Sequence, residues 1–186
     1  TFYNNRMSSV FVESKFLPKT TSYFGVSHNQ IQPLFDYTFV NDEKSYTNYN
    51  ITAVQLAFQW NPFSNYMQTP IGKIEYEKRH PKFSLQLTQT LPGVLENDFA
   101  FSKIDFKTFY ELPYLSGQKS SVLLQTGIAF GDVPITHLYS IVPNNLNREA
   151  ILQRVTFAGK NSFETMYFNE FFSNQYASLQ LKHTFN

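Results

Sequence analysis

The chain has 186 residues, no cysteine and a net charge of +1. The charge balance gives no electrostatic basis for binding nucleic acid or for a polybasic membrane anchor. The lack of cysteine excludes disulfide bonds and thiolate metal sites. Charged residues make up 16% of the chain, whereas soluble domains average roughly 25%. Aromatic residues reach 18%, mostly Phe and Tyr, which favour β-strands and membrane interfaces.

Alternation of apolar and polar residues predicts β-strands along most of the chain. The pattern is clearest in ITAVQLAFQW, residues 51–60. Large apolar side chains such as Leu56 and Phe58 share one face there, and small or amide side chains such as Ala53 and Gln55 share the other. About eight or nine strands follow one another, mostly antiparallel by the lengths of their connections. In chain order, strands are expected at 10–16, 21–28, 51–60, 73–80, 83–89, 102–112, 121–130 and 177–185.

The expected connections differ in length. Short turns are predicted at 79–82 and 113–119, where Pro or Gly interrupts the alternation. The longest connection is 131–161. If the strands cross a membrane, we expect this connection on the outer side. It begins with Gly-Asp-Val-Pro, where Gly131 would adopt a positive φ and Pro134 would end the strand. No apolar run reaches the roughly 18 residues of a transmembrane helix.

Two architectures are compatible with such strands. A soluble β-sandwich buries its apolar faces between two sheets, whereas a transmembrane β-barrel turns them to lipid and lines its lumen with small and polar residues. Residues 51–60 favour the barrel, because Ala53 and its neighbours suit a crowded lumen and the length matches the ~9–11 residues that cross a bilayer. Trp60, Phe63 and Tyr66 follow, where an aromatic girdle would lie. We expect part of an antiparallel transmembrane β-barrel, with a ligand- or partner-binding β-sandwich as the alternative.

The alternation also predicts which side chains face lipid and which face the lumen. Expected to face lipid are Val54, Leu56, Phe58, Leu124, Ile128, Leu179 and Leu181. Expected to face the lumen are Ala53, Gln55, Gln59, Gln125, Gly127, Gln180 and Lys182.

Charged residues on three of these strands are candidates for the lumen lining. Their signs are mixed, so they either pair across a filled lumen or line a polar pore. The segment 161–173 has two mixed faces and is the expected plug, with Glu164 or Glu170 meeting Lys103, Lys107 or Lys182. The candidate lumen-lining residues are Lys73, Glu75, Glu77, Arg79, Lys103, Asp105, Lys107, Glu111 and Lys182.

No catalytic constellation is visible in the sequence. The histidines His28, His80, His137 and His183 lack the spacing of metal ligands. Neither a Gly-x-Ser-x-Gly nucleophile motif nor a phosphate-binding loop occurs. We therefore expect a protein that is not an enzyme and needs no metal or other cofactor.

Three stretches resemble an uncharacterised outer-membrane barrel family of Bacteroidota. They are YMQTPIGKIEYEKRHPKFSLQLTQTLPGVLENDFAFSKIDF (66–106), GIAFGDVPITHL (127–138) and SFETMYFNEFFSNQYASLQLKHTF (162–185). They occur in the family's order, and Asn174 stands where the family often has Asp. Residues 1–50 show no such resemblance. The order of strands is also similar to the C-terminal half of BamA/TamA-like barrels, a likeness of fold that says little about function.

The resemblance implies a place and a class of function. Members of that family carry an N-terminal carboxypeptidase-regulatory-like domain, so residues 1–186 would be part of the barrel of a longer protein. The expected location is the outer membrane of a Gram-negative bacterium. The expected function is transport, assembly of the envelope and its outer-membrane proteins, or anchoring of periplasmic domains. The implied partners are outer-membrane lipid and other envelope proteins in a complex.

Overall fold

The computed structural model describes residues 3–15, 17–34, 39–41, 44–46, 48–97, 99–140 and 172–185. Within these ranges the fold is all-β, with one short 3-10 helix, η1 (Ile135–His137). None of the described residues form a helix long and apolar enough to cross a membrane.

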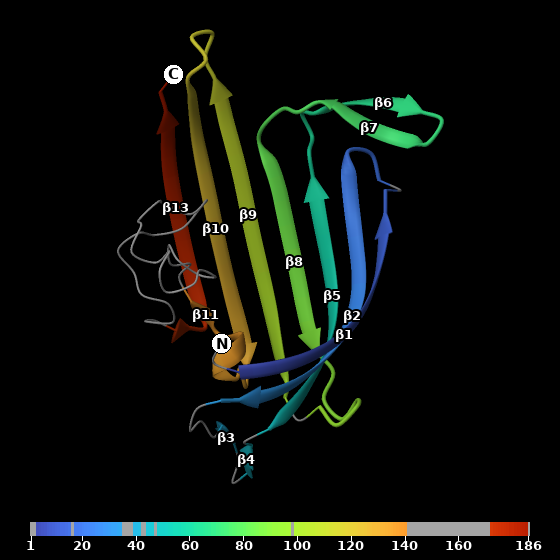
Figure 1. The fold of residues 1–186 in the computed structure, drawn as a ribbon, viewed down its shortest axis with the longest axis vertical. Helices are drawn as coiled ribbons and strands as arrows, with labels where there is room; N and C mark the ends of the chain where they lie inside the picture. The colour runs from blue at the N-terminus through green and yellow to red at the C-terminus, as the bar shows by residue number, and fades with distance from the viewer. Residues whose placement is uncertain are drawn as a thin grey trace.

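The main element is a seven-stranded sheet in the order β1-β2-β5-β8-β9-β10-β13 (Figure 1). Every neighbouring pair in it is antiparallel. Within the described residues β1 and β13 each pair on one side only, so the sheet has two open edges. Its strands are β1 (Tyr3–Ser14), β2 (Thr20–Pro33), β5 (Tyr49–Trp60), β8 (Lys82–Thr90), β9 (Phe101–Pro113), β10 (Lys119–Gly131) and β13 (Gln175–Thr184).

Three short hairpins accompany this sheet. They are β3 (Phe39–Asn41) with β4 (Lys44–Tyr46), β6 (Asn65–Thr69) with β7 (Gly72–Glu77), and β11 (Tyr139–Ser140) with β12 (Phe172–Ser173). The hairpin of β6 and β7 lies across the end of the sheet where β8 begins, and β3 with β4 lies at the opposite end (Figure 1).

Most predicted strands are confirmed to within two residues. The five strands from β5 onward in the main sheet agree in this way with the alternation of the sequence. The strand predicted at 10–16 is wrong at its start, because β1 begins at Tyr3, and the strand predicted at 21–28 is wrong at its end, because β2 continues to Pro33 along β1. The segment 73–80 does contain a strand, but that strand pairs with β6 and not with the main sheet.

The register of the sheet separates the two predicted sets of side chains. Directly opposed residues of antiparallel strands share a face. Leu56 lies opposite Leu87, which lies opposite Ile104, and this row continues to Ile128. Gln55 heads the neighbouring row, which continues through Thr88, Lys103 and Ala129. The side chains predicted to face lipid and those predicted to face the lumen therefore lie on opposite faces of one sheet.

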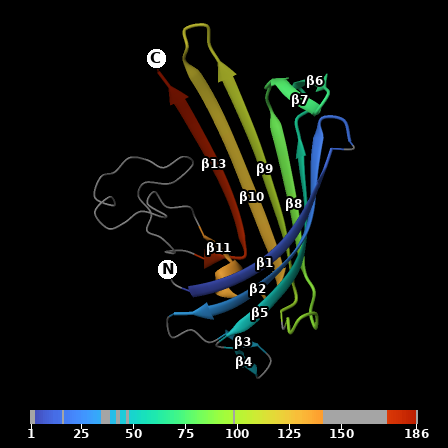
Figure 2. The ribbon, with the colours of Figure 1, turned by 45° about the vertical axis from the view of Figure 1, so that its right-hand side comes forward.

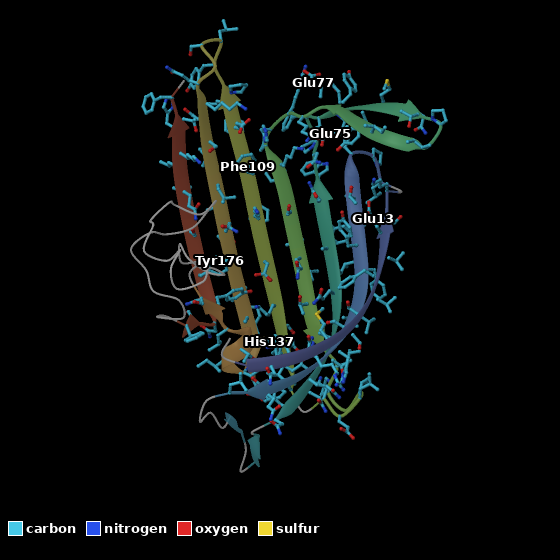
Figure 3. All side chains as sticks on the ribbon, viewed as in Figure 1. Glu13, Glu75, Glu77, Phe109, His137 and Tyr176 are labelled. Carbon is cyan, nitrogen blue, oxygen red and sulfur yellow. The ribbon has the colours of Figure 1, made fainter. Side chains whose placement is uncertain are left out.

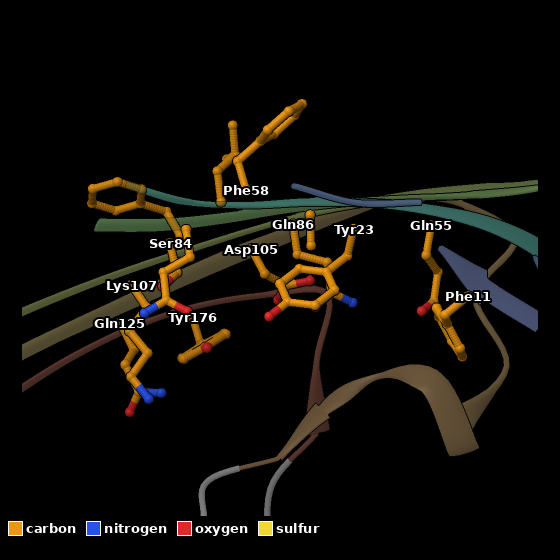
Figure 4. A pocket seen from close by; sticks show the side chains of 14 residues that line it. Phe11, Tyr23, Gln55, Phe58, Ser84, Gln86, Asp105, Lys107, Gln125 and Tyr176 are labelled. Atoms are coloured by element: carbon orange, nitrogen blue, oxygen red, sulfur yellow. The ribbon is translucent and has the colours of Figure 1, made fainter. Parts of the chain in front are cut away.

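The sheet is strongly curved, and its two faces differ in chemistry (Figure 2). Figure 4 shows Phe58 on one side and Gln55, Gln86 and Asp105 on the other. The convex face carries exposed apolar side chains, such as Val10 and Leu181, each 73% exposed. No second sheet of the described residues packs on this face, so Leu56 and Leu179 share no dry core between two sheets.

A small apolar core lies on the concave side, at the end of the sheet where β9 begins. Its members are almost fully buried and come from β2, β5, β9 and the connection before β9. The rings of Tyr49 and Phe99 meet edge to face at 5.2 Å between centroids. Val133, which follows β10, packs against this cluster. The cluster consists of Ile31, Tyr49, Ile51, Phe99 and Phe101.

Candidate functional site

The chain turns inward directly after β10. Gly131 has a φ of +90°, and a side chain there would collide with the carbonyl oxygen of Ala100. Pro134 then precedes η1, as the Gly-Asp-Val-Pro sequence predicted for a strand end. Residues 132–140, here called the inward segment, lie on the concave side of the sheet (Figure 2). The beginning of the predicted outer loop 131–161 thus folds over the sheet, and the remainder of that loop lies outside the described residues.

The first part of the inward segment is held by the apolar core. Beside the contact of Val133, the His137 ring lies 5.5 Å from the Phe101 ring, measured between centroids. The hydroxyl groups of Tyr49 and Thr136 are 2.8 Å apart and share a hydrogen bond. Because its contacts come from β5 and β9, this part joins strands that are not neighbours in the sheet.

Lys103 is a predicted lumen-lining residue, and its contacts are with the inward segment. Its ammonium group donates a hydrogen bond of 3.0 Å to the carbonyl oxygen of His137. The same nitrogen lies 4.0 Å from the centroid of the Tyr139 ring, a cation–π distance. Glu164 and Glu170, its predicted partners, lie outside the described residues.

Tyr139 occupies a socket that exists because residue 127 is glycine. A Cβ atom on Gly127 would lie 2.7 Å from Cζ of Tyr139 and 2.6 Å from Cε1 of Tyr176. It would also lie 2.9 Å from Oδ1 of Asp105. The two tyrosine rings are 4.7 Å apart between centroids. Only glycine leaves room for these three side chains to converge.

The Tyr139 hydroxyl group is satisfied within the same cluster. Burial raises the pKa of Tyr139, and its hydrogen bond to Asp105 raises the pKa further, so the hydroxyl stays protonated. It therefore donates to the Asp105 carboxylate, and it also lies 3.4 Å from the carbonyl oxygen of Ile128. Asp105 was predicted to line the lumen, and in the structure it positions the inward segment.

The other predicted residues of the main sheet lie on the concave face. Asp105 and Lys107 line a hollow of about 680 Å³ there (Figure 4). Glu111 pairs with Lys119 at 3.8 Å. Neither Lys107 nor Lys182 forms an ion pair with another described residue. In the described part of the chain, the one ion pair formed by these residues of the main sheet is therefore between neighbouring strands, and none of the ion pairs there lies across the concave face.

Lys73, Glu75, Glu77 and Arg79 do not line the concave face between strands of the main sheet. They belong to the hairpin of β6 and β7 and to the residues after it, at the end of the sheet (Figure 3). The prediction that they share a strand of the barrel wall is wrong. The chain turns at Pro62 and again before Gly72, so β7 returns onto β6 and β8 takes the place beside β5.

An ion pair fastens this hairpin to the sheet. Nζ of Lys82 in β8 lies 2.8 Å from Oε1 of Glu75, and the two side chains are 17% and 19% exposed. Burial alone would raise the pKa of Glu75, but hydrogen bonds from Lys82 and Ser64 outweigh it and hold the pKa below its usual value. Glu77 accepts a 2.6 Å hydrogen bond from Asn65 and pairs with Arg79 at 2.8 Å, on a more exposed surface.

We predict that Lys82→Met loosens the hairpin from the sheet. Removing one partner of a mostly buried pair leaves the Glu75 carboxylate with the hydrogen bond from Ser64 but without its countercharge, which costs about 1–3 kcal/mol. Because the pKa of Glu75 is lowered by folding, this contribution is present at neutral pH and lost as pH falls through that lowered pKa. Hydrogen exchange of residues 61–81 at pH 7 measures it. Glu77→Gln is the control and should change little; equal effects of the two variants would contradict the assignment.

We further predict that docking of the inward segment weakens in acid. Burial lowers the pKa of His137 to about 4, and the charge of Lys103 acts in the same direction. A free histidine has a pKa of about 6.5, so below that pH the undocked state takes up a proton that the docked state refuses. Hydrogen exchange of residues 132–140, corrected for its intrinsic pH dependence, should rise between pH 7 and pH 5. In His137→Asn this rise should vanish, and its persistence would point to another group.

Sequence reasoning did not single out Tyr139, Tyr176 or Thr136. It placed Gly127 on the lumen side. A glycine in a strand indicates that another group comes close to the backbone there, but the sequence does not show which side chain does so. Among the described residues, no group of three or more His, Cys, Asp or Glu side chains could hold a metal ion.

These features define an all-β, antiparallel domain with one polar, partly filled face and one apolar face that no second sheet of the described residues covers. The chain belongs to a family of unknown function, DUF5686, of which residues 2–186 match the C-terminal domain. No curated protein and no solved structure matches the chain.

Proposed function

We propose that this domain is part of the wall of an antiparallel transmembrane β-barrel in the outer membrane of a Gram-negative bacterium. The observation that carries the proposal is the curved single sheet whose uncovered convex face is apolar and whose concave face is polar. In a barrel the apolar convex face contacts lipid, and the polar concave face lines an internal lumen. β9 and β10 have 13 residues each, which exceeds the ~9–11 needed to cross a bilayer with tilt.

Aromatic residues at one end of the convex face support this placement. Trp60 is exposed there and stacks on Phe83, with 5.4 Å between ring centroids. Phe63 is exposed beyond the strand end. Such rings suit the boundary between hydrocarbon and headgroups. Tyr66, the third predicted girdle residue, instead accepts a hydrogen bond from Asn61 within the hairpin.

The barrel acts as a non-enzymatic envelope protein in transport, in assembly of outer-membrane proteins, or as an anchor for periplasmic domains. The sequence resemblance to the Bacteroidota barrel family with a carboxypeptidase-regulatory-like domain supports this range. The fold-level similarity to BamA/TamA-like barrels supports assembly within it. Partners are then membrane lipid and other envelope proteins.

The single tryptophan of the chain makes a direct test of the wall possible. In a Trp60→Phe background, a tryptophan is placed at Leu56 on the convex face or at Gln55 on the concave face. Lipids brominated in the acyl chain quench fluorescence by contact. Strong quenching is expected for Leu56→Trp and weak quenching for Gln55→Trp. Equal quenching, or a protein that stays in solution without detergent, would favour the soluble β-sandwich instead.

The orientation in the membrane is a separate prediction. The turn at 113–119 and residues 79–82 lie at one end of the sheet, and Gly131 lies at the other (Figure 1). Outer-membrane barrels keep their short turns in the periplasm, so we place 113–119 there and the connection 131–161 outside. Protease added to whole cells should cut within 131–161 and spare 113–119. The opposite pattern of cleavage would reverse the orientation.

A further inference from the structure

We infer that the inward segment closes the lumen at the end where β10 finishes, and that Tyr139 in the Gly127 socket is the latch of this closure. The inference rests on the proposed barrel and assigns to it a closing element within residues 132–140. The plug predicted from sequence, 161–173, lies outside the described residues apart from its last two, which pair with Tyr139 and Ser140 in the hairpin of β11 and β12.

The position of the segment supports a closure. Figures 1 and 2 both show η1 on the concave side, close to the N-terminal half of β1, which curls around the same end of the sheet. The segment therefore lies over the concave ends of β5, β9 and β10, on the side toward which β1 curls. A molecule that moves along the concave face would therefore meet the inward segment at this end of the sheet.

Beside its pairing with β12, the segment has two side-chain attachments that differ in chemistry. Val133 and His137 rest on the apolar core, whose members are almost fully buried. Tyr139 is held by polar groups, the ammonium of Lys103 and the carboxylate of Asp105. A contact between polar groups exchanges readily with water, whereas the apolar core does not. Release at Tyr139 therefore leaves the core and the fold in place.

The hollow of the concave face reaches this latch. Asp105 and Tyr176 line the hollow, and both also surround Gly127 and the Tyr139 ring. When Tyr139 leaves its socket, the hollow gains the volume of that ring and extends toward the end of the sheet. The latch thus separates the hollow from the outside of the barrel.

Cysteine labelling tests the closure, because the chain has no cysteine of its own. Gln125→Cys places one thiol on the concave face beside the hollow. The full-length protein in intact cells, with any cysteine outside residues 1–186 replaced by serine, is treated with a charged thiol reagent that does not cross the membrane. The thiol should react slowly in this parent and at least tenfold faster when Tyr139→Ala is added. Tyr139→Phe keeps the ring and its contact with Lys103 but loses the hydrogen bond to Asp105, so its rate should lie between those of the parent and of Tyr139→Ala.

Two further variants keep the test decisive. Tyr76→Ala removes an exposed tyrosine of the hairpin and should leave the rate unchanged. Gly127→Leu fills the socket and should accelerate labelling as Tyr139→Ala does, by a different route. Each variant is first checked by the Leu56→Trp quenching measurement, which reports the wall independently of the segment. Fast labelling of the parent, or unchanged rates in both Tyr139→Ala and Gly127→Leu, would overturn the latch while leaving the barrel intact.

Discussion

Leu56→Arg should lower the free energy of unfolding from lipid vesicles by about 2–4 kcal/mol, the cost of a cation near the middle of a bilayer. Leu56 lies near the centre of β5 on the convex face, in a row with Leu87 and Ile104. An arginine there must either enter hydrocarbon or distort the strand to reach the headgroups. Urea titration of the full-length protein folded into vesicles measures the loss.

Gln55→Arg is the matched control for this variant. Gln55 is the neighbouring residue of the same strand and lines the hollow of the concave face. Its arginine would point into a polar space, so the cost should be clearly smaller. A similar loss for both variants would mean that the two faces of β5 meet the same environment, which is incompatible with a barrel wall.

Phe101→Ala should be the most damaging substitution in the apolar core, costing about 3–5 kcal/mol. Phe101 is 1% exposed and contacts the His137 ring, so its removal opens a cavity beneath η1. The backbone there is fixed by hydrogen bonds with Thr90 on both its amide and its carbonyl group, which limits collapse around the cavity. The loss should appear in urea titration and as weaker protection of residues 132–140.

Phe130→Ala serves as its control. Phe130 lies close to the same end of the sheet but on the convex face, and it is 51% exposed. Its truncation leaves no enclosed cavity and should cost much less. If Phe101→Ala were as mild as Phe130→Ala, the cluster around Phe101 would not be a packed core, and the first attachment of the inward segment would lose its basis.

The alternation of the sequence was sufficient to predict β5, β8, β9, β10 and β13 and their faces. Period-two patterning is a local property, so β5, β9 and β10 could be located without knowing their neighbours. The same pattern places Leu56 and Gln55 on opposite faces of the strand, whether lipid or a protein core covers it.

Two parts of the structure depend on contacts that alternation does not encode. A charged strand such as Lys73–Glu77 has the same pattern whether it pairs with β5 or with its own hairpin partner. Its place follows from the buried ion pair between Glu75 and Lys82, which joins separate strands. In the same way, the meeting of Tyr139 with Gly127 depends on the register of β9, β10 and β13, which no single segment specifies.

The two open edges of the sheet constrain the order of events in biogenesis. Among the described residues each edge strand has a neighbouring strand on one side only, and in the proposed barrel hydrocarbon would offer no hydrogen bond to backbone groups on the other side. Every such group would cost several kcal/mol in the bilayer core. If the domain is the barrel wall proposed above, its insertion is coupled to strand pairing at β1 and β13, and the rate of insertion is limited by the supply of strands that pair with these two edges.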